Sequence, residues 1–351
     1  MRSKPNTRLR RGWTTGACAT AATKAALFAL WNNEILDLVS ITLPKGEKPI
    51  FKVAFFKRKN NWVEAGIIKD AGDDPDVTHG ALIKVKVEEI RSGIIFCAGP
   101  GVGLVTKPGL PLAVGEPAIN PMPRKFISET VEEVAKKFNQ KPNVQITISI
   151  PNGEKIAKKT WNSRLGIKNG LSILGTTGIV RPFSCAAWIA SIHRGIDVAV
   201  ATKVKHVAGC TGSTSEAVVQ DLYGLPKHAM LDMGDFSGGL LKYLRRHPIP
   251  KLTIGGGIGK MTKLAQGARD LHSKRSQVDF SLLNKWAEED NLGHVLHANT
   301  ALEAYEICGP DLAAIIAKKA LVCVAEQLGE VDITCDIVVV DRGGKIIGRA
   351  S

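Results

Sequence analysis

The chain has 351 residues, of which 44% are hydrophobic and 23% charged, and its formal net charge is +14. The length predicts about two domains, and the composition is typical of a soluble globular protein. No run of about 18 apolar residues is present and no apolar segment follows the basic N-terminus, which excludes a membrane span and a secretory signal and leaves a cytoplasmic location as the expectation.

The first part of the chain is dominated by strands. Residues 14–30 are rich in small side chains and predict a helix that Thr14 or Thr15 caps. Alternating and β-branched residues then predict strands at 38–44, 49–57, 62–70, 81–90, 93–99 and 143–151, with one helix at 124–138. Crowded strands with few helices indicate an α+β domain over residues 1–160.

Strands and helices alternate in the remainder, residues 161–351. The pattern predicts strands at 171–180, 197–203, 228–234 and 251–257, and helices at 185–196, 215–224, 238–247 and 261–272. Residues 281–330 look helical, and 332–350 read as a hairpin around Arg342-Gly343-Gly344. This alternation is typical of a mostly parallel α/β layer, so the fold class is α/β with an α+β N-terminal part.

The start of the first helix is one candidate binding site. Thr14, Thr15 and Gly16 open it, and free N–H groups at a helix start bind anions. Arg10 and Arg11 lie just upstream, where a guanidinium could pair with a carboxylate. Taken by themselves, these residues favour the alternative of an ordinary cap that follows an exposed basic tail.

Residues 70–79, DAGDDPDVTH, gather four carboxylates and an imidazole. Such crowding can raise the pKa of one carboxylate and create a proton acceptor, or it can hold a hard cation. The EF-hand pattern fails because its bidentate Glu is missing. A solvated turn in which aspartates cap their own backbone explains the segment equally well.

Glycine-rich loops follow two predicted strands. Gly99–Gly103 runs into residues 104–109, LVTKPG, which cannot open a helix, so we reject a dinucleotide site there. Leu174–Gly178 ends a strand, and the carboxyl ends of strands in an α/β sheet are a common place for ligand contact.

The loop Gly255–Gly259 joins a strand to a helix and is the best candidate for a cofactor, because glycine lets a ligand touch the backbone. It is not a P-loop, since Met261 rather than Ser or Thr follows Lys260. A tight turn without a ligand is the alternative.

Cysteine and histidine give weaker signals. The seven cysteines form no C-x-x-C pair, which indicates buried small hydrophobes in a reducing compartment rather than disulfides or zinc, and we predict no metal site. His272, with Asp279 nearby, could carry a proton, although a surface histidine is the more frequent outcome.

Five segments, in this order along the chain, closely resemble the CbiD family. They are residues 10–26, 69–81, 98–125, 149–182 and 254–273. The resemblance covers about residues 9–280, and its middle segments are long and specific. Residues 269–279 depart from the family pattern, because a stretch richer in histidine is expected where this chain has His272.

The resemblance implies transfer of a methyl group from S-adenosyl-L-methionine to ring carbon 1 of cobalt-precorrin-5B, a step of cobalamin biosynthesis that gives cobalt-precorrin-6A. It also implies an α+β part followed by a Rossmann-like part. On this basis we expect Asp73 or Asp74 to accept a proton. The expected methyl-donor contacts are Gly175, Thr176, Thr177, Gly178, Gly255, Gly256, Gly257 and Gly259.

The implied substrate carries several carboxylate arms, which agrees with the net charge of +14. The expected contacts to it are Arg10, Arg11, Thr14, Thr15, Arg124, Arg164 and Arg181.

Two other classes of function are alternatives to methyl transfer. A nucleic-acid-binding protein would suit the charge, but this chain lacks interleaved aromatic residues. A nicotinamide-dependent tetrapyrrole reductase is disfavoured because the chain lacks the dinucleotide-binding fingerprint. We therefore expect a small-molecule substrate, with no nucleic-acid or membrane partner, and the sequence is compatible with a homo-oligomer.

Overall fold

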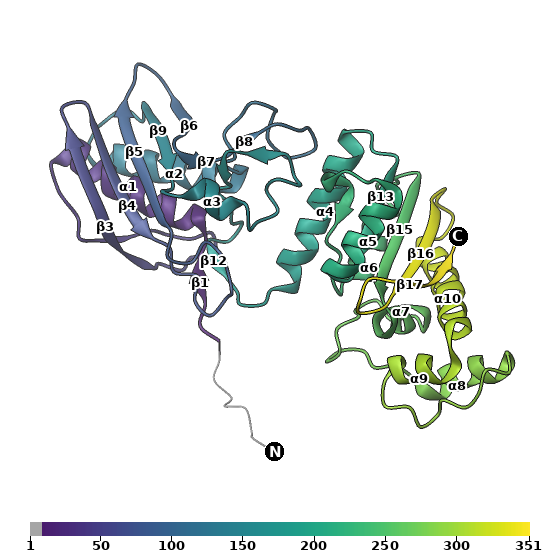
Figure 1. The fold of residues 1–351 in the computed structure, drawn as a ribbon. Coiled ribbons are helices and arrows are strands. Elements are labelled where there is room, and N and C mark those ends of the chain that lie inside the picture. Colours follow the sequence, from purple (N-terminus) through teal and green to yellow (C-terminus); the bar gives the residue numbers. More distant parts are fainter. Residues whose placement is uncertain (1–8) are drawn as a thin grey trace. The chain divides into compact units, whose positions relative to one another are not determined.

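The computed structural model describes residues 9–351, which form two compact units that divide between Ser184 and Cys185 (Figure 1). Each unit has a large hydrophobic core of its own. Among residues 9–351, no helix is both long enough and apolar enough to cross a bilayer.

The first unit packs helices against a mixed sheet. Its six main strands lie in the order β2-β3-β4-β5-β9-β6, and only β6 and β9 run parallel. The elements are β1 (Gly12–Trp13), α1 (Thr15–Asn32), β2 (Leu38–Ser40), β3 (Ile50–Lys59), β4 (Trp62–Ile68), β5 (Leu82–Glu89), β6 (Ile94–Ala98), β7 (Gly101–Val102), β8 (Leu104–Val105), α2 (Pro121–Lys137), β9 (Val144–Ser149), α3 (Gly153–Ala157), β10 (Ile167–Lys168), β11 (Gly170–Leu171) and β12 (Ile179–Val180).

Helix α1 is the centre of this unit. Thr14 caps it, since its side-chain oxygen accepts a hydrogen bond of 3.2 Å from the Ala17 N–H. The interior is almost entirely alanine and other small residues, and Ala19 and Ala22 are fully buried. Small side chains let the helix approach β4, β5 and α2 closely, which confirms the predicted helix and explains its composition.

The first unit extends beyond the predicted boundary at residue 160. Residues 161–184 are tied to it by three short strand pairs, in which β10 pairs with β8, β11 with β7 and β12 with β1. The β11–β7 pair is so close that a Cβ at Gly170 would lie 2.4 Å from the Gly101 carbonyl carbon. Strands of two residues carry no periodic signal, so the sequence placed the boundary too early.

The second unit is an α/β layer. Its sheet has the order β14-β13-β15-β16-β17, in which the first four strands are parallel and β17 is antiparallel to β16. The elements are α4 (Cys185–Ala201), β13 (His206–Cys210), α5 (Ser213–Tyr223), η1 (Lys227–Ala229), β14 (Met230–Leu231), α6 (Ser237–Leu244), β15 (Lys251–Gly257), α7 (Ile258–Ala265), α8 (Phe280–Glu289), α9 (Ala301–Cys308), α10 (Pro310–Leu328), β16 (Thr334–Val340) and β17 (Ile346–Ala350).

The predicted strand at 251–257 and the four predicted helices up to residue 272 are confirmed as β15, α4, α5, α6 and α7, but two predictions about this unit are wrong. Most of the predicted strand at 197–203 is the end of helix α4, and the central strand β13 was not predicted. Both errors arise because Val and Ala suit a buried helix and a buried strand alike. The predicted C-terminal hairpin is confirmed as β16 and β17.

Helices cover both faces of the second sheet (Figure 1). A Cβ at Gly255 would lie 2.7 Å from a methyl of Val219, which belongs to α5. A Cβ at Gly209 would lie 2.6 Å from a methyl of Leu240, which belongs to α6, and Gly209 pairs with Ile254 rather than with Gly255. Gly209 therefore shares the face of Ile254, and Gly255 lies on the opposite face because neighbouring residues of a strand point to opposite faces. It follows that α6 covers one face of the sheet and α5 the other.

A buried ion pair in the first unit gives a test of its stability. The Lys69 side chain is 2% exposed and its ammonium lies 2.6 Å from Asp76. We expect Asp76→Asn to lower the free energy of unfolding by about 2–3 kcal/mol, because it leaves the buried ammonium unpaired. Urea denaturation at neutral pH measures this. Adding Lys69→Met should restore most of the loss, and a single variant as stable as the original protein would contradict the assignment.

Candidate functional site

The carboxyl edge of the second sheet is where the candidate site lies. After β13 the chain passes through α5 to β14 on one side, and after β15 it continues through α7 to α10 and returns as β16 on the other side. β13 and β15 are neighbours, so the chain leaves adjacent strands in opposite directions. A crevice opens outside the strand ends at such a switch point and commonly binds ligands.

A cavity of about 600 Å³ occupies this edge. Its walls are the loop after β13, the start of α7, the start of α9 and the loop after β16. The lining residues are Thr211, Gly212, Ser213, Thr214, Ser215, Gly257, Ile258, Gly259, Lys260, Thr300, Ala301, Leu302, Val340, Asp341 and Arg342. We call it the edge cavity. Its volume lies within the range of small-molecule sites, roughly 300–1,000 Å³.

The glycines of residues 255–259 differ in what surrounds them. A Cβ at Gly255 or Gly256 would meet another side chain at 2.7 Å, so these two are glycine because the sheet is tightly packed there. A Cβ at Gly257 would meet only one atom, at 4.0 Å, and a Cβ at Gly259 would meet none within 4 Å. Of the glycines in residues 255–259, Gly257 and Gly259 line the edge cavity, and they present bare backbone to it.

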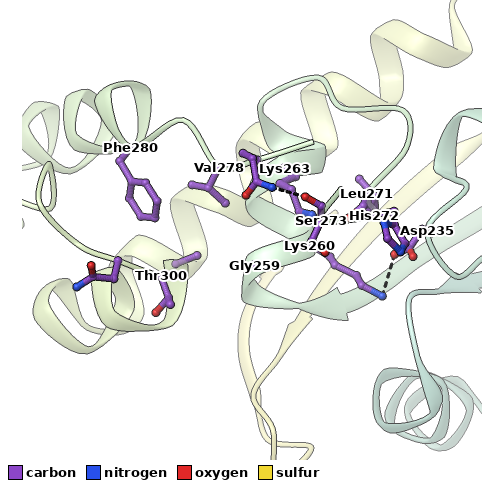
Figure 2. A pocket seen from close by; sticks show the side chains of 13 residues that line it. Asp235, Gly259, Lys260, Lys263, Leu271, His272, Ser273, Val278, Phe280 and Thr300 are labelled. Atoms are coloured by element: carbon purple, nitrogen blue, oxygen red, sulfur yellow. Dashed lines mark hydrogen bonds and ion pairs between the residues drawn. The ribbon is translucent and has the colours of Figure 1, made fainter. Parts of the chain in front are cut away.

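A second cavity of about 470 Å³ adjoins the first, and we call it the side cavity (Figure 2). The two share Gly259, Lys260, Thr300 and Ala301, so they meet at the start of α7. Its other lining residues are Asp235, Lys263, Leu271, His272, Ser273, Gln277, Val278, Phe280 and Asn299.

Charged groups concentrate where the cavities meet. Lys260 extends toward Asp235, and its Nζ lies 2.9 Å from Asp235 Oδ1 (Figure 2). Lys263 is buried and donates hydrogen bonds to the carbonyl oxygens of Leu271 and Ser276. Burial lowers the pKa of the Lys263 ammonium. His272 lines the side cavity, and its Nδ1 accepts a hydrogen bond from the Lys274 N–H.

The other predicted donor loop, Gly175–Gly178, lies in the first unit. There it packs on its own unit, since a Cβ at Gly175 would lie 2.3 Å from the Thr14 hydroxyl and one at Gly178 2.5 Å from Leu43. Thr177 accepts a local hydrogen bond from the Ile179 N–H. These contacts give the loop a structural role in the first unit, whereas Gly255–Gly259 belongs to the second unit.

The predicted substrate contacts Thr14 and Thr15 are both buried. Besides capping α1, Thr14 donates its backbone N–H to the Gly178 carbonyl oxygen, and the Thr15 hydroxyl accepts from the Leu174 N–H at 2.9 Å. The Gly16 N–H is also used, by the Leu174 carbonyl. The Gly16 and Ala17 N–H groups at the start of α1 are therefore engaged within the protein, as in the alternative of an ordinary cap.

The acidic segment 70–79 holds the first unit together. Arg10 pairs through both terminal nitrogens with Asp70, and these hydrogen bonds lower the pKa of Asp70 to about 2. Asp73 accepts a hydrogen bond of 2.6 Å from the Arg10 N–H, and Asp74 accepts one of 2.8 Å from the Phe183 N–H. Asp73 and Asp74 thus anchor distant chain segments, whereas the solvated-turn interpretation had aspartates cap their own backbone. Such local capping is made by Asp70 and Asp76, which accept from the N–H groups of Gly72 and Thr78.

The other predicted arginines differ in how far they are engaged. Arg11 lies 3.5 Å from Glu47. Arg124 is held by Glu116 and by the carbonyl oxygens of Pro117 and Ile119. Arg164 lies over the ring of Trp161. Arg181 is exposed, and no ion pair is recorded for it within residues 9–351. All of them lie in the first unit.

Sequence reasoning missed Asp235, Asp341 and the segment Thr211–Ser215, which runs from the end of β13 into the first turn of α5. The segment GCTGSTSEA carries the available signal, because Gly, Ser and Thr precede a helix there. Without β13 as a predicted strand, that segment could not be placed at a strand end.

Among residues 9–351, no group of three or more His, Cys, Asp or Glu side chains could hold a metal ion. Cys18, Cys210, Cys308 and Cys335 are buried, and burial raises the pKa of Cys18 to about 12.

Comparisons with known proteins cover nearly the whole chain. A family profile described as CbiD matches residues 2–182, and one described as CbiD, C-terminal domain, matches residues 270–351. A protein of Brucella anthropi named cobalt-precorrin-5B C(1)-methyltransferase is 56% identical over 99% of this chain and 97% of its own length. One of the same name from Paramagnetospirillum magneticum is 53% identical over 97% and 98%.

A crystal structure of a cobalamin biosynthesis protein (cbiD) from Archaeoglobus fulgidus is 30% identical to this chain. The alignment covers 81% of this chain and 85% of that one, with a TM-score of 0.42.

The two kinds of glycine in residues 255–259 predict different effects of a Gly→Ala substitution on the free energy of unfolding. Gly255→Ala should lower the free energy of unfolding by about 1–3 kcal/mol, because its Cβ overlaps Val219. Gly259→Ala should change it by less than about 0.5 kcal/mol, since its Cβ enters open space. Thermal unfolding of the two variants measures the difference, and equal losses would contradict the distinction.

Proposed function

The chain belongs to the CbiD family, and we propose that it transfers a methyl group from S-adenosyl-L-methionine to ring carbon 1 of cobalt-precorrin-5B, giving cobalt-precorrin-6A and S-adenosylhomocysteine. The observation that carries the placement of the donor is the edge cavity, where Gly257 and Gly259 leave backbone uncovered at a switch point of the sheet. The names of the two bacterial relatives support the reaction.

The residues of the edge cavity fit a nucleoside. Bare backbone at Gly257 and Gly259 allows a flat base or a ribose to approach closely. Asp341 lies at the end of β16, the strand beside β15, and a carboxylate in that position can accept hydrogen bonds from ribose hydroxyls. Apolar side chains of Ile258, Leu302 and Val340 complete the wall and exclude water.

The reaction needs little acid–base chemistry from the protein. A bound sulfonium supplies an activated methyl group, whose bond to sulfur breaks with the electron pair left on sulfur while an electron pair of the ring carbon forms the new C–C bond. The protein's contribution is then to align the donor with the acceptor and to exclude water. This agrees with the structural roles of Asp73 and Asp74 as anchors.

The charge of the chain supports a substrate rich in carboxylates. A net charge of +14 attracts polyanions, and the macrocycle carries several acetate and propionate arms. Of the predicted arginine contacts, we retain Arg181, which is exposed, as a candidate for a carboxylate arm. Arg10, Arg11 and Arg124 already pair with carboxylates of the protein, so they are weaker candidates.

Donor binding can be tested at Gly259 with side chains of graded size. Gly259→Leu should weaken S-adenosyl-L-methionine binding at least about a hundredfold, because the side chain would fill the space against the backbone. Gly259→Ala is the matched control and should stay much closer to the original affinity. Isothermal titration calorimetry gives both dissociation constants, and unchanged affinity in the leucine variant would remove the donor from the edge cavity.

The reaction itself is tested by mass analysis. The protein is incubated with methyl-labelled S-adenosyl-L-methionine and the cobalt-precorrin-5 pool. We expect one labelled methyl group in the tetrapyrrole product. A tetrapyrrole that stays unlabelled, although the donor binds, would contradict the proposed acceptor.

A further inference from the structure

The ion pair between Lys260 and Asp235 stands where the edge cavity and the side cavity meet. Lys260 lines both cavities, whereas Asp235 lines the side cavity. The Lys260 Nζ also donates a hydrogen bond of 2.9 Å to the Thr211 carbonyl oxygen. That contact fixes the ammonium at the junction, between the end of β13 and the loop after β14.

The Asp235 carboxylate has acceptor capacity left in this position. Its Oδ1 is buried, and within residues 9–351 it faces the Lys260 ammonium, 2.9 Å away, as an ion-pair partner. A carboxylate has about four lone-pair sites, and buried polar atoms in proteins are nearly always hydrogen-bonded. A ligand in the side cavity that carries N–H donors could therefore hydrogen-bond to Asp235.

An adjacent cation and anion match the two ends of an α-amino acid. The ammonium of Lys260 suits an α-carboxylate, and the carboxylate of Asp235 suits an α-ammonium group. Lys263, the other lysine of the side cavity, is buried and donates to the carbonyl oxygens of Leu271 and Ser276. The Lys260 side chain is 38% exposed and donates to one carbonyl oxygen, that of Thr211, so it is the more available cation.

We propose that Lys260 and Asp235 bind the zwitterionic amino-acid end of the methyl donor in the side cavity, while its nucleoside lies in the edge cavity. This inference rests on the proposed function. The shared lining at Gly259, Lys260, Thr300 and Ala301 gives the single ligand a continuous path from one cavity to the other. The methyl-bearing sulfur, which lies between the nucleoside and the amino acid, is thereby placed near the start of α7.

The test compares three ligands that share parts of the donor. S-adenosyl-L-methionine carries both ends, 5′-methylthioadenosine carries the nucleoside without the amino acid, and L-methionine carries the amino acid alone. Calorimetry on the unaltered protein should show 5′-methylthioadenosine binding at least about tenfold more weakly than S-adenosyl-L-methionine, and L-methionine more weakly still. Equal affinity for the first two would overturn the proposal without any variant.

The variants Asp235→Asn and Lys260→Gln then localise the effect. Each should weaken S-adenosyl-L-methionine binding about tenfold to a hundredfold and leave 5′-methylthioadenosine within about twofold, because only the first ligand reaches the pair. Retained binding of 5′-methylthioadenosine shows that the site is still folded. Lys285→Gln is the matched control for loss of one positive charge, since Lys285 pairs with Glu289 outside both cavities.

The outcomes separate this inference from the proposed function. If the two variants weaken the binding of both ligands to the same extent, or of neither, the ion pair only joins the loop after β14 to α7. In that case the proposed methyl transfer would not be contradicted, but Lys260 and Asp235 would not bind the amino-acid end of the donor. Failure of the unaltered protein to bind S-adenosyl-L-methionine at all would overturn both.

Discussion

The second unit depends on one constraint, the close approach of backbone at the carboxyl ends of two neighbouring parallel strands. β13 and β15 pair in register from His206 to Cys210, and the chain then leaves them in opposite directions. Gly255 keeps the strands packed under α5, while Gly257 and Gly259 leave the space above them open. The edge cavity therefore follows from connectivity and from missing side chains. The end of β16 brings Asp341 to it, and the segment after β14 brings Asp235 to the side cavity.

The first unit uses its charged residues differently. The motifs that look most reactive in its sequence are the threonines at the start of α1 and the aspartates of residues 70–76, and both are bound to other parts of the same unit. Asp74 is a clear case, because its oxygen accepts from Phe183, 109 residues away. A segment rich in carboxylates can thus be required for the fold without taking part in the chemistry.

The sequence predicted much of the architecture and only part of the site. Small residues located α1, and strand and turn signals located β15 and the C-terminal hairpin. Of the glycines predicted to contact the donor at the β15–α7 junction, Gly257 and Gly259 have uncovered backbone, and their contact with the donor stays a prediction. Periodicity could not separate a buried strand from a buried helix, so β13 was missed, and with it the segment Thr211–Ser215 that leads from β13 into α5. Nor could it show that Gly175 packs on Thr14, because that contact joins residues distant in the sequence.

A crystal structure of the protein with S-adenosylhomocysteine would test the central claim most directly. The account predicts density for the nucleoside against Gly257 and Gly259, with its ribose toward Asp341. Density at the Gly175–Gly178 loop of the first unit instead, with the cavity at the end of β15 filled only by water, would contradict it.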